Sequence, residues 1–148
     1  MTKDDDLIIK RLAGNDSLKR TLGSKRFSYI CNNDNTIRWI FPKELESPMF
    51  LNFYSISSIK AQIIAICIKL AYLIRFPSLV RTGEIEIEIQ KESILDSILS
   101  KYKHDGFSIF TGTIGENRKA IIELHKNNKT FIFIKVALKN KSKILVVN

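Results

Sequence analysis

Cysteine and histidine are scarce in this sequence, and their scarcity narrows the chemistry that the chain can perform. Cys31 and Cys67 are the only cysteines among 148 residues, and they are too far apart for a Cys-x-x-Cys motif. Structural zinc sites and disulfide frameworks need more cysteines or histidines at close spacing, so we expect neither. His104 and His125 have no serine or cysteine at a spacing typical of nucleophilic catalysis, which favours solvated polar roles. The low cysteine content favours a reducing, cytoplasmic location.

Long apolar runs are also absent. The most apolar stretch, residues 56–80, is interrupted by Lys60, Lys69 and Arg75. Its uninterrupted parts are far shorter than the roughly 20 apolar residues that a membrane-spanning helix needs. The first ten residues are acidic and lack the apolar segment of a signal peptide. We therefore expect a cytoplasmic protein, with membrane association limited to the surface.

Positive charge is abundant, and the formal net charge is +9 at pH 7. This charge is compatible with three classes of partner: nucleic acid, an anionic membrane surface and phosphorylated small molecules. The simplest interpretation is a lysine-rich solvated surface. No run of five or six basic residues marks a nucleic-acid-binding tail, so nucleic acid is the least favoured partner.

The first third of the chain predicts a helix followed by a hairpin. Acidic residues at Asp4–Asp6 and the basic residues Lys10 and Arg11 suit the dipole of a helix that stops at Gly14. Residues 15–25 are polar and typical of turns. Residues 27–31 and 36–41 then flank an Asn/Asp-rich segment, which is typical of a β-hairpin. A loop is expected from Pro42 to Pro48.

The middle of the chain predicts a long apolar helix over Ile56–Arg75. Its isoleucines and leucines recur at spacings of three and four, and further apolar residues widen that stripe until most sides of the helix are apolar. Such a helix is usually buried or docked on a partner, so we expect the side chain of Ile63 to be covered. Pro77 is expected to end the helix.

The remainder predicts mostly strands. Glu84–Gln90 alternates between charged and apolar residues, which indicates a strand with one acidic and one buried face. Residues 92–101 predict a short helix. Residues 107–138 then predict three consecutive antiparallel strands, with a two-residue hairpin turn at Asn127–Asn128. The segment after residue 138 is compatible with a helix start or an edge strand.

These elements predict a single α+β domain over residues 1–148. It comprises an N-terminal helix and hairpin, the long apolar helix and a C-terminal antiparallel sheet of three to five strands. Residues 75–83 are compatible with a hinge between an N-terminal extension, residues 1–80, and a C-terminal part, residues 84–148.

The candidate site is the glycine-containing turn after residue 110 together with Lys135. A turn between two strands can bring backbone N–H groups against phosphate oxygens, and glycine permits that approach because it carries no side chain. Strand alternation puts Phe131, Phe133, Lys135 and Ala137 on one face and apolar residues on the core face. Lys135 is then either a phosphate ligand or an edge-strand lysine that prevents aggregation.

A family resemblance favours the phosphate ligand. Residues 107–138, FSIFTGTIGENRKAIIELHKNNKTFIFIKVAL, resemble the opening of aminoglycoside-phosphotransferase-like kinases. The resemblance is to a bacterial branch often found with surface-polysaccharide genes, which has a GTxGxxRK turn and an aromatic residue two positions before the strand lysine. The matching positions are Gly112, Thr113, Gly115, Asn117, Arg118 and Lys119 in the turn, and Phe133 and Lys135 in the strand.

The resemblance implies a kinase-like N-lobe that binds ATP with Mg²⁺ and belongs to a small-molecule or glycan phosphotransferase of polysaccharide biosynthesis. The nucleotide-binding residues that it implies are Gly112, Thr113, Gly115, Asn117 and Lys135. One departure is Glu116, which lies inside the turn and would repel phosphate unless its side chain points away. Another is that only two glycines of the protein-kinase GxGxxG pattern are present.

A kinase of this class also needs a second lobe with a catalytic aspartate and metal-binding residues. Only thirteen residues follow Lys135, so we expect a truncated fragment that is inactive on its own and whose partner is a missing C-terminal lobe or another protein. Two alternatives remain open. One is a basic membrane-docking or protein-docking module that uses residues 56–75. The other is non-specific nucleic-acid binding.

Overall fold

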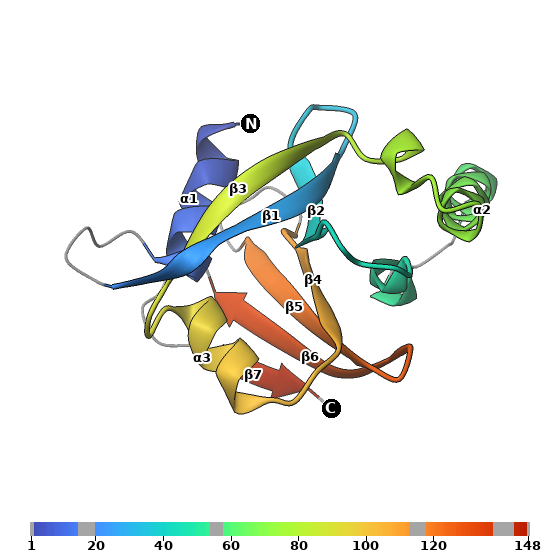
Figure 1. Ribbon diagram of the computed structural model, residues 1–148. Helices are drawn as coiled ribbons and strands as arrows, with labels where there is room; N and C mark the ends of the chain where they lie inside the picture. Colours follow the sequence, from blue (N-terminus) through green and yellow to red (C-terminus); the bar gives the residue numbers. More distant parts are fainter. Residues whose placement is uncertain (1, 15–19, 54–57, 113–117, 138–143, 148) are drawn as a thin grey trace.

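The computed structural model describes residues 2–14, 20–53, 58–112, 118–137 and 144–147, which form helices around one twisted antiparallel sheet (Figure 1). The sheet has seven strands in the order β3-β1-β2-β4-β5-β6-β7. In chain order the elements are α1 (Lys3–Ala13), β1 (Thr21–Cys31), β2 (Ile37–Pro42), the 3₁₀ helix η1 (Met49–Phe53), α2 (Ile59–Leu73), the 3₁₀ helix η2 (Pro77–Leu79), β3 (Gly83–Gln90), α3 (Ile94–Lys101), β4 (Gly106–Phe110), β5 (Lys119–Lys126), β6 (Lys129–Ala137) and β7 (Ile144–Val147).

The α+β class is as predicted, but the sheet is larger than the expected three to five strands. The N-terminal hairpin does not stand apart, because β2 pairs with β4 through Trp39 and Ile40. β1 pairs in turn with β3. Strands from residues 1–80 and from residues 84–148 therefore share one sheet.

Helix α1 forms as its terminal charges predict. The Thr2 hydroxyl accepts a hydrogen bond from the Asp5 N–H, and the Asp5 carboxylate accepts one from the Thr2 N–H, which makes a capping box. At the other end Gly14 has a φ of 97° and donates its N–H to the Lys10 carbonyl. Local capping thus defines both ends of the helix.

Strand β1 begins at Thr21, within the segment that the sequence analysis assigned to turns. That assignment was wrong for residues 21–25, which belong to β1 and pair with β3 through Thr21, Ser24 and Lys25 although these residues are exposed. Arg26 lies opposite Glu86 in this ladder, and opposite charges across a strand pair are favourable. β3 itself has the expected two faces, with Ile87 and Ile89 buried and its glutamates exposed.

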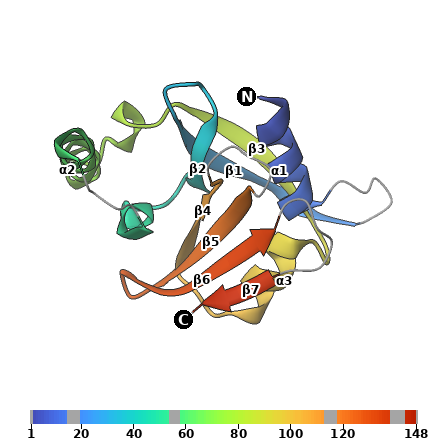
Figure 2. The same cartoon turned by 180° about the vertical axis from the view of Figure 1, so that it is seen from behind.

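Helices cover the two faces of the sheet from opposite sides. α1 and α3 pack on one face, where Leu12 and Ile98 join Phe27 and Ile122 in the larger core cluster. α2 and η1 lie on the other side (Figures 1 and 2). There they form a second, aromatic cluster, whose members include Trp39, Phe41, Phe50, Ile68 and Tyr72. β2 serves both clusters, since successive side chains of a strand point to opposite faces.

Strand β6 confirms the predicted alternation. Ile132, Ile134 and Val136 of β6 are buried, whereas Lys135 is half-buried on the other face. Asn127 and Asn128 have φ angles of 52° and 58°, as the two-residue hairpin turn requires. The segment after residue 138 was compatible with a helix start or an edge strand, and its residues 144–147 form strand β7. β6 therefore lies between β5 and β7, and the alternative in which Lys135 protects a sheet edge is wrong.

Helix α2 is shorter and less covered than predicted. It begins after its cap Ser58 and ends at Leu73, two residues before Arg75 adopts a φ of 58° and four before Pro77. Only one side is buried, where Ala65, Ile68 and Tyr72 join the aromatic cluster. The expectation that Ile63 is covered was wrong, since 57% of this residue is exposed. None of the described helices is long and apolar enough to cross a membrane.

We therefore expect Ile63→Asp to change the free energy of unfolding by less than about 0.5 kcal/mol, because the new carboxylate stays in water. Ile68→Ala on the opposite side of α2 is the comparison, since Ile68 is buried. It should cost about 2 kcal/mol through the cavity that it leaves. Urea denaturation of the two variants tests this, and a larger loss for Ile63→Asp would place that side chain in a covered environment.

Candidate functional site

The base of the candidate phosphate-binding turn is tightly closed. The chain leaves β4 at Phe110 and rejoins the sheet at Lys119. Gly112 has a φ of 72°, and a Cβ atom there would lie 2.3 Å from the Lys119 carbonyl oxygen. Glycine is therefore needed at this position both for its left-handed conformation and for the close backbone approach. The turn residues 113–117, which include Thr113, Gly115 and Asn117, lie outside the described residues.

Lys135 lies close to this turn along the sheet. It pairs with Ile121 of β5, and Ala137, two residues further on, pairs with Lys119 where the turn ends. Two residues of a strand extend about 7 Å. The structure thus brings Gly112 and Lys135, the two described residues of the predicted site, to the same end of the β4–β5–β6 sheet.

Arg118 has a structural role that the sequence did not indicate. Its side chain is buried, and its Nε donates a hydrogen bond of 3.0 Å to the Thr111 carbonyl oxygen. Its Nη2 lies 3.3 Å from Thr111 Oγ1 and 3.7 Å from Asp5 Oδ1. The guanidinium therefore holds the base of the turn against α1 and is turned towards the protein interior.

Asp5 is the centre of this buried network. Its Oδ1 accepts a hydrogen bond of 3.2 Å from the Ile37 N–H, and its Oδ2 accepts two from Thr2. Thr111 completes the network through its N–H to the Arg38 carbonyl oxygen and its hydroxyl to the Ile37 carbonyl oxygen. One carboxylate thus ties the start of α1 to the start of β2 and, through Arg118, to the turn.

A second polar cluster joins residues that looked unrelated in the sequence. Ser108 Oγ donates a hydrogen bond of 3.1 Å to Glu123 Oε2, and His125 Nε2 lies 3.5 Å from the same hydroxyl. His125 is 3% exposed, so the expectation that it is solvated was wrong. The signal was available, because the predicted β4–β5 hairpin pairs Ser108 with Glu123. Since all three side chains are buried, we assign the cluster to the fold and not to catalysis.

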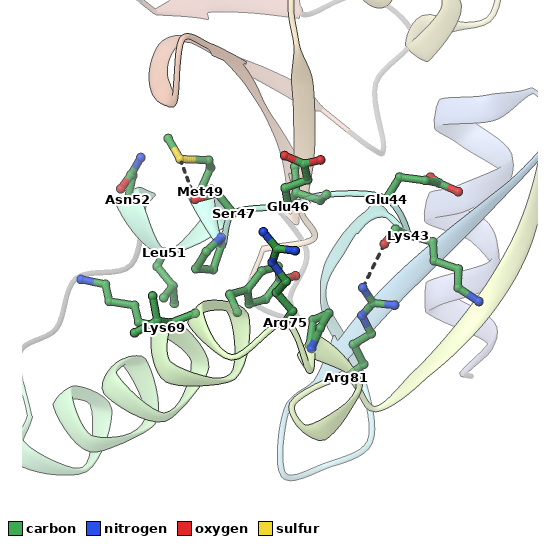
Figure 3. A pocket seen from close by; sticks show the side chains of 15 residues that line it. Lys43, Glu44, Glu46, Ser47, Met49, Leu51, Asn52, Lys69, Arg75 and Arg81 are labelled. Atoms are coloured by element: carbon green, nitrogen blue, oxygen red, sulfur yellow. Dashed lines mark hydrogen bonds between the residues drawn. The ribbon is translucent and has the colours of Figure 1, made fainter.

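A cavity of about 900 Å³ lies elsewhere, between the loop after β2, η1 and the end of α2 (Figure 3). Lys43, Lys69, Arg75 and Arg81 line it together with two glutamates. Neither Gly112 nor Lys135 is among its lining residues. The cavity is thus separate from the candidate phosphate-binding turn.

Arg81 and Tyr72 are two of the residues that line this cavity. Arg81 Nη2 donates a hydrogen bond of 2.9 Å to the Lys43 carbonyl oxygen, which fixes the loop to the segment before β3 (Figure 3). Burial raises the pKa of Tyr72 to about 12, although the nearby Arg81 guanidinium acts in the opposite direction. The side chain of Lys43, another lining residue, donates a hydrogen bond to Glu84 and thereby lowers the pKa of that carboxyl. Cations are thus concentrated beside the end of α2.

Comparison of the chain with family models, with curated proteins and with solved structures finds no match in any of the three. The arguments for function that follow rest on the residues of this chain.

Proposed function

We propose that β4, β5 and β6 form the nucleotide phosphate-binding part of a small-molecule or glycan phosphotransferase, with ATP and Mg²⁺ as the ligand. The observation that carries the proposal is the shared location of the glycine turn and Lys135 at one end of three consecutive antiparallel strands. This arrangement supports it because a phosphate chain needs close backbone N–H groups and a positive charge on the same side.

Each described residue has a definite part in this proposal. Gly112 lets the two ends of the turn approach each other, at Gly112 and Lys119. The half-buried Lys135 supplies a charge that is screened less by salt than a fully exposed one. Thr113, Gly115 and Asn117 are proposed to contact the phosphates from the turn, whereas Arg118 is excluded because it is engaged with Thr111 and Asp5.

In this proposal the catalytic residues come from outside the β4–β5–β6 sheet. Among the described residues, no group of three or more histidine, cysteine, aspartate or glutamate side chains is placed to hold a metal ion. Mg²⁺ would then arrive with the ATP phosphates. A second lobe or a partner protein would supply the catalytic aspartate and the remaining metal ligands.

An NMR titration with Mg-ATP on the wild type, Lys135→Met and Lys129→Met tests this proposal. In the wild type we expect chemical-shift changes clustered at residues 111–119 and 133–135, with a Kd of about 1 mM, because β4, β5 and β6 would supply only one side of the proposed cleft. Lys135→Met should abolish them and leave the fold intact, since methionine fills a similar volume. Lys129, on the exposed start of the same strand, is the control whose removal should leave the titration unchanged.

Two outcomes would contradict the proposal. Shifts that spread over all lysines at low salt and vanish at high salt would show only that a basic protein attracts a polyanion, as in the nucleic-acid alternative. Clustered shifts that persist in Lys135→Met would show that the turn binds ATP without this lysine.

A further inference from the structure

Helix α2 and the segment after it expose an unusually large set of apolar side chains. Ile59, Ile63, Ile66, Leu70 and Leu73 of the helix are each more than half exposed. Ile74, Phe76 and Leu79 extend this surface past the end of the helix with similar exposure. In both views α2 lies at the outside of the molecule, on the side away from α1 and α3 (Figures 1 and 2). A soluble surface rarely carries such a contiguous patch without a binding role.

The five exposed residues form one stripe along the helix. Their spacing of four, three, four and three residues keeps them on a single face, because each residue turns the helix by about 100°. The stripe lies opposite the buried side, which carries Ala61, Ala65, Ile68 and Tyr72. α2 is therefore apolar both on its buried side and on its exposed side.

Lysines border the stripe on both of its sides. At about 100° per residue, Lys60 lies on one flank of the helix and Lys69 on the other. Both are exposed, and Lys69 also lines the cationic cavity beside Arg75 and Arg81. No aspartate or glutamate occurs anywhere from Ser47 to Gly83. Within residues 47–83 the apolar surface is thus accompanied by positive charges only, although Glu44 and Glu46 also line the cavity that Lys69 borders.

We propose that the exposed face of α2 docks on an anionic membrane surface. The apolar stripe would enter the region between headgroups and acyl chains, while Lys60 and Lys69 extend sideways to lipid phosphates, as lysines at such boundaries do. The helix lies along the surface in this arrangement, because fifteen residues extend only about 22 Å against a hydrocarbon thickness of about 30 Å.

The lysines beside the stripe distinguish this occupant from a second copy of the chain. The α2 segment of a second copy would cover the stripe but would offer no negative charge to Lys60 and Lys69, because residues 47–83 contain no aspartate or glutamate. An anionic lipid surface instead satisfies both features at once, since it offers apolar depth and negative charge. This proposal does not depend on nucleotide binding and involves neither Gly112 nor Lys135.

Vesicle sedimentation of the full chain tests the proposal, without nucleotide. The wild type should sediment with vesicles of equal phosphatidylcholine and phosphatidylglycerol and much less with phosphatidylcholine alone. The variant Ile66→Glu/Leu70→Glu should bind the anionic vesicles at least about tenfold more weakly, because two apolar anchors are lost. Leu22→Glu on β1 is the matched control, since Leu22 and Ile66 are both 55% exposed, and it should bind as the wild type does.

A second variant and a second measurement complete the test. Lys60→Gln/Lys69→Gln should reduce the preference for anionic vesicles, and thermal melting should show that all variants remain folded. Absence of wild-type sedimentation would overturn the proposal, as would equal loss in Leu22→Glu. A dimer in sedimentation velocity that Ile66→Glu/Leu70→Glu dissociates would also overturn it and would assign the stripe to a second copy.

Discussion

Asp5→Ala is expected to lower the free energy of unfolding by about 3–5 kcal/mol, because it removes the buried partner of Arg118 and leaves that guanidinium only the exposed Asp4, at 4.0 Å, as a counter-charge. Asp5 is 1% exposed, and its carboxylate faces Arg118 at 3.7 Å. The same change leaves the Ile37 N–H without its acceptor at the start of β2. For a chain of this length the melting temperature should fall by about 10 °C.

Asp6→Ala is the matched control in α1. Asp6 pairs with Lys10 at 2.7 Å, but both side chains are more than two-fifths exposed. Such surface pairs contribute little, so the control should lose no more than about 0.5 kcal/mol. Urea denaturation of both variants gives the comparison. Equal, small losses would show that the Asp5–Arg118 network does not hold α1 to the sheet.

Gly112→Ala is expected to destabilise the protein by about 3 kcal/mol and to weaken the proposed ATP binding. A left-handed conformation costs a non-glycine residue about 1–2 kcal/mol. The added Cβ would also overlap the Lys119 carbonyl oxygen, and because neither atom can move without the backbone that carries it, the two ends of the turn must separate. A turn opened in this way would no longer hold its N–H groups in place for phosphates.

Gly23→Ala separates these two costs. Gly23 has a φ of 119°, but nothing lies within 4 Å of a Cβ placed there. This control should therefore show the conformational cost alone. If Gly112→Ala loses no more stability than Gly23→Ala, the close approach at the base of the turn is absent in solution.

The sequence predicted the features that depend on neighbouring residues along the chain. The end of α1 before Gly14, the Asn127–Asn128 turn and the two faces of β3 all follow from local backbone geometry or from alternation. The same holds for the face of β6 that carries Lys135. These predictions succeeded because the backbone geometry of a helix or strand determines which side chains share a face.

Sequence patterns failed where exposure depended on what packs against an element. Ile63 and Ile68 are both isoleucines of an apolar helix, yet one is exposed and the other buried, because the aromatic cluster around Phe50 covers one side only. Residues 21–25 looked like turns because polar side chains also occur on a strand whose ladder to β3 is exposed. Composition could not distinguish these cases, since it does not specify the partner.

Local sequence patterns by themselves determined the α+β class, the strands β4, β5 and β6, and the placement of Lys135 on the face opposite the core. Only the tertiary structure decided that β6 is an interior strand, that Arg118 meets Asp5 across 113 positions of sequence, and that α2 has an exposed apolar face. The physical reason is the range of the interactions. Backbone periodicity acts over a few residues, whereas ion pairing and burial depend on which distant segments the sheet brings together.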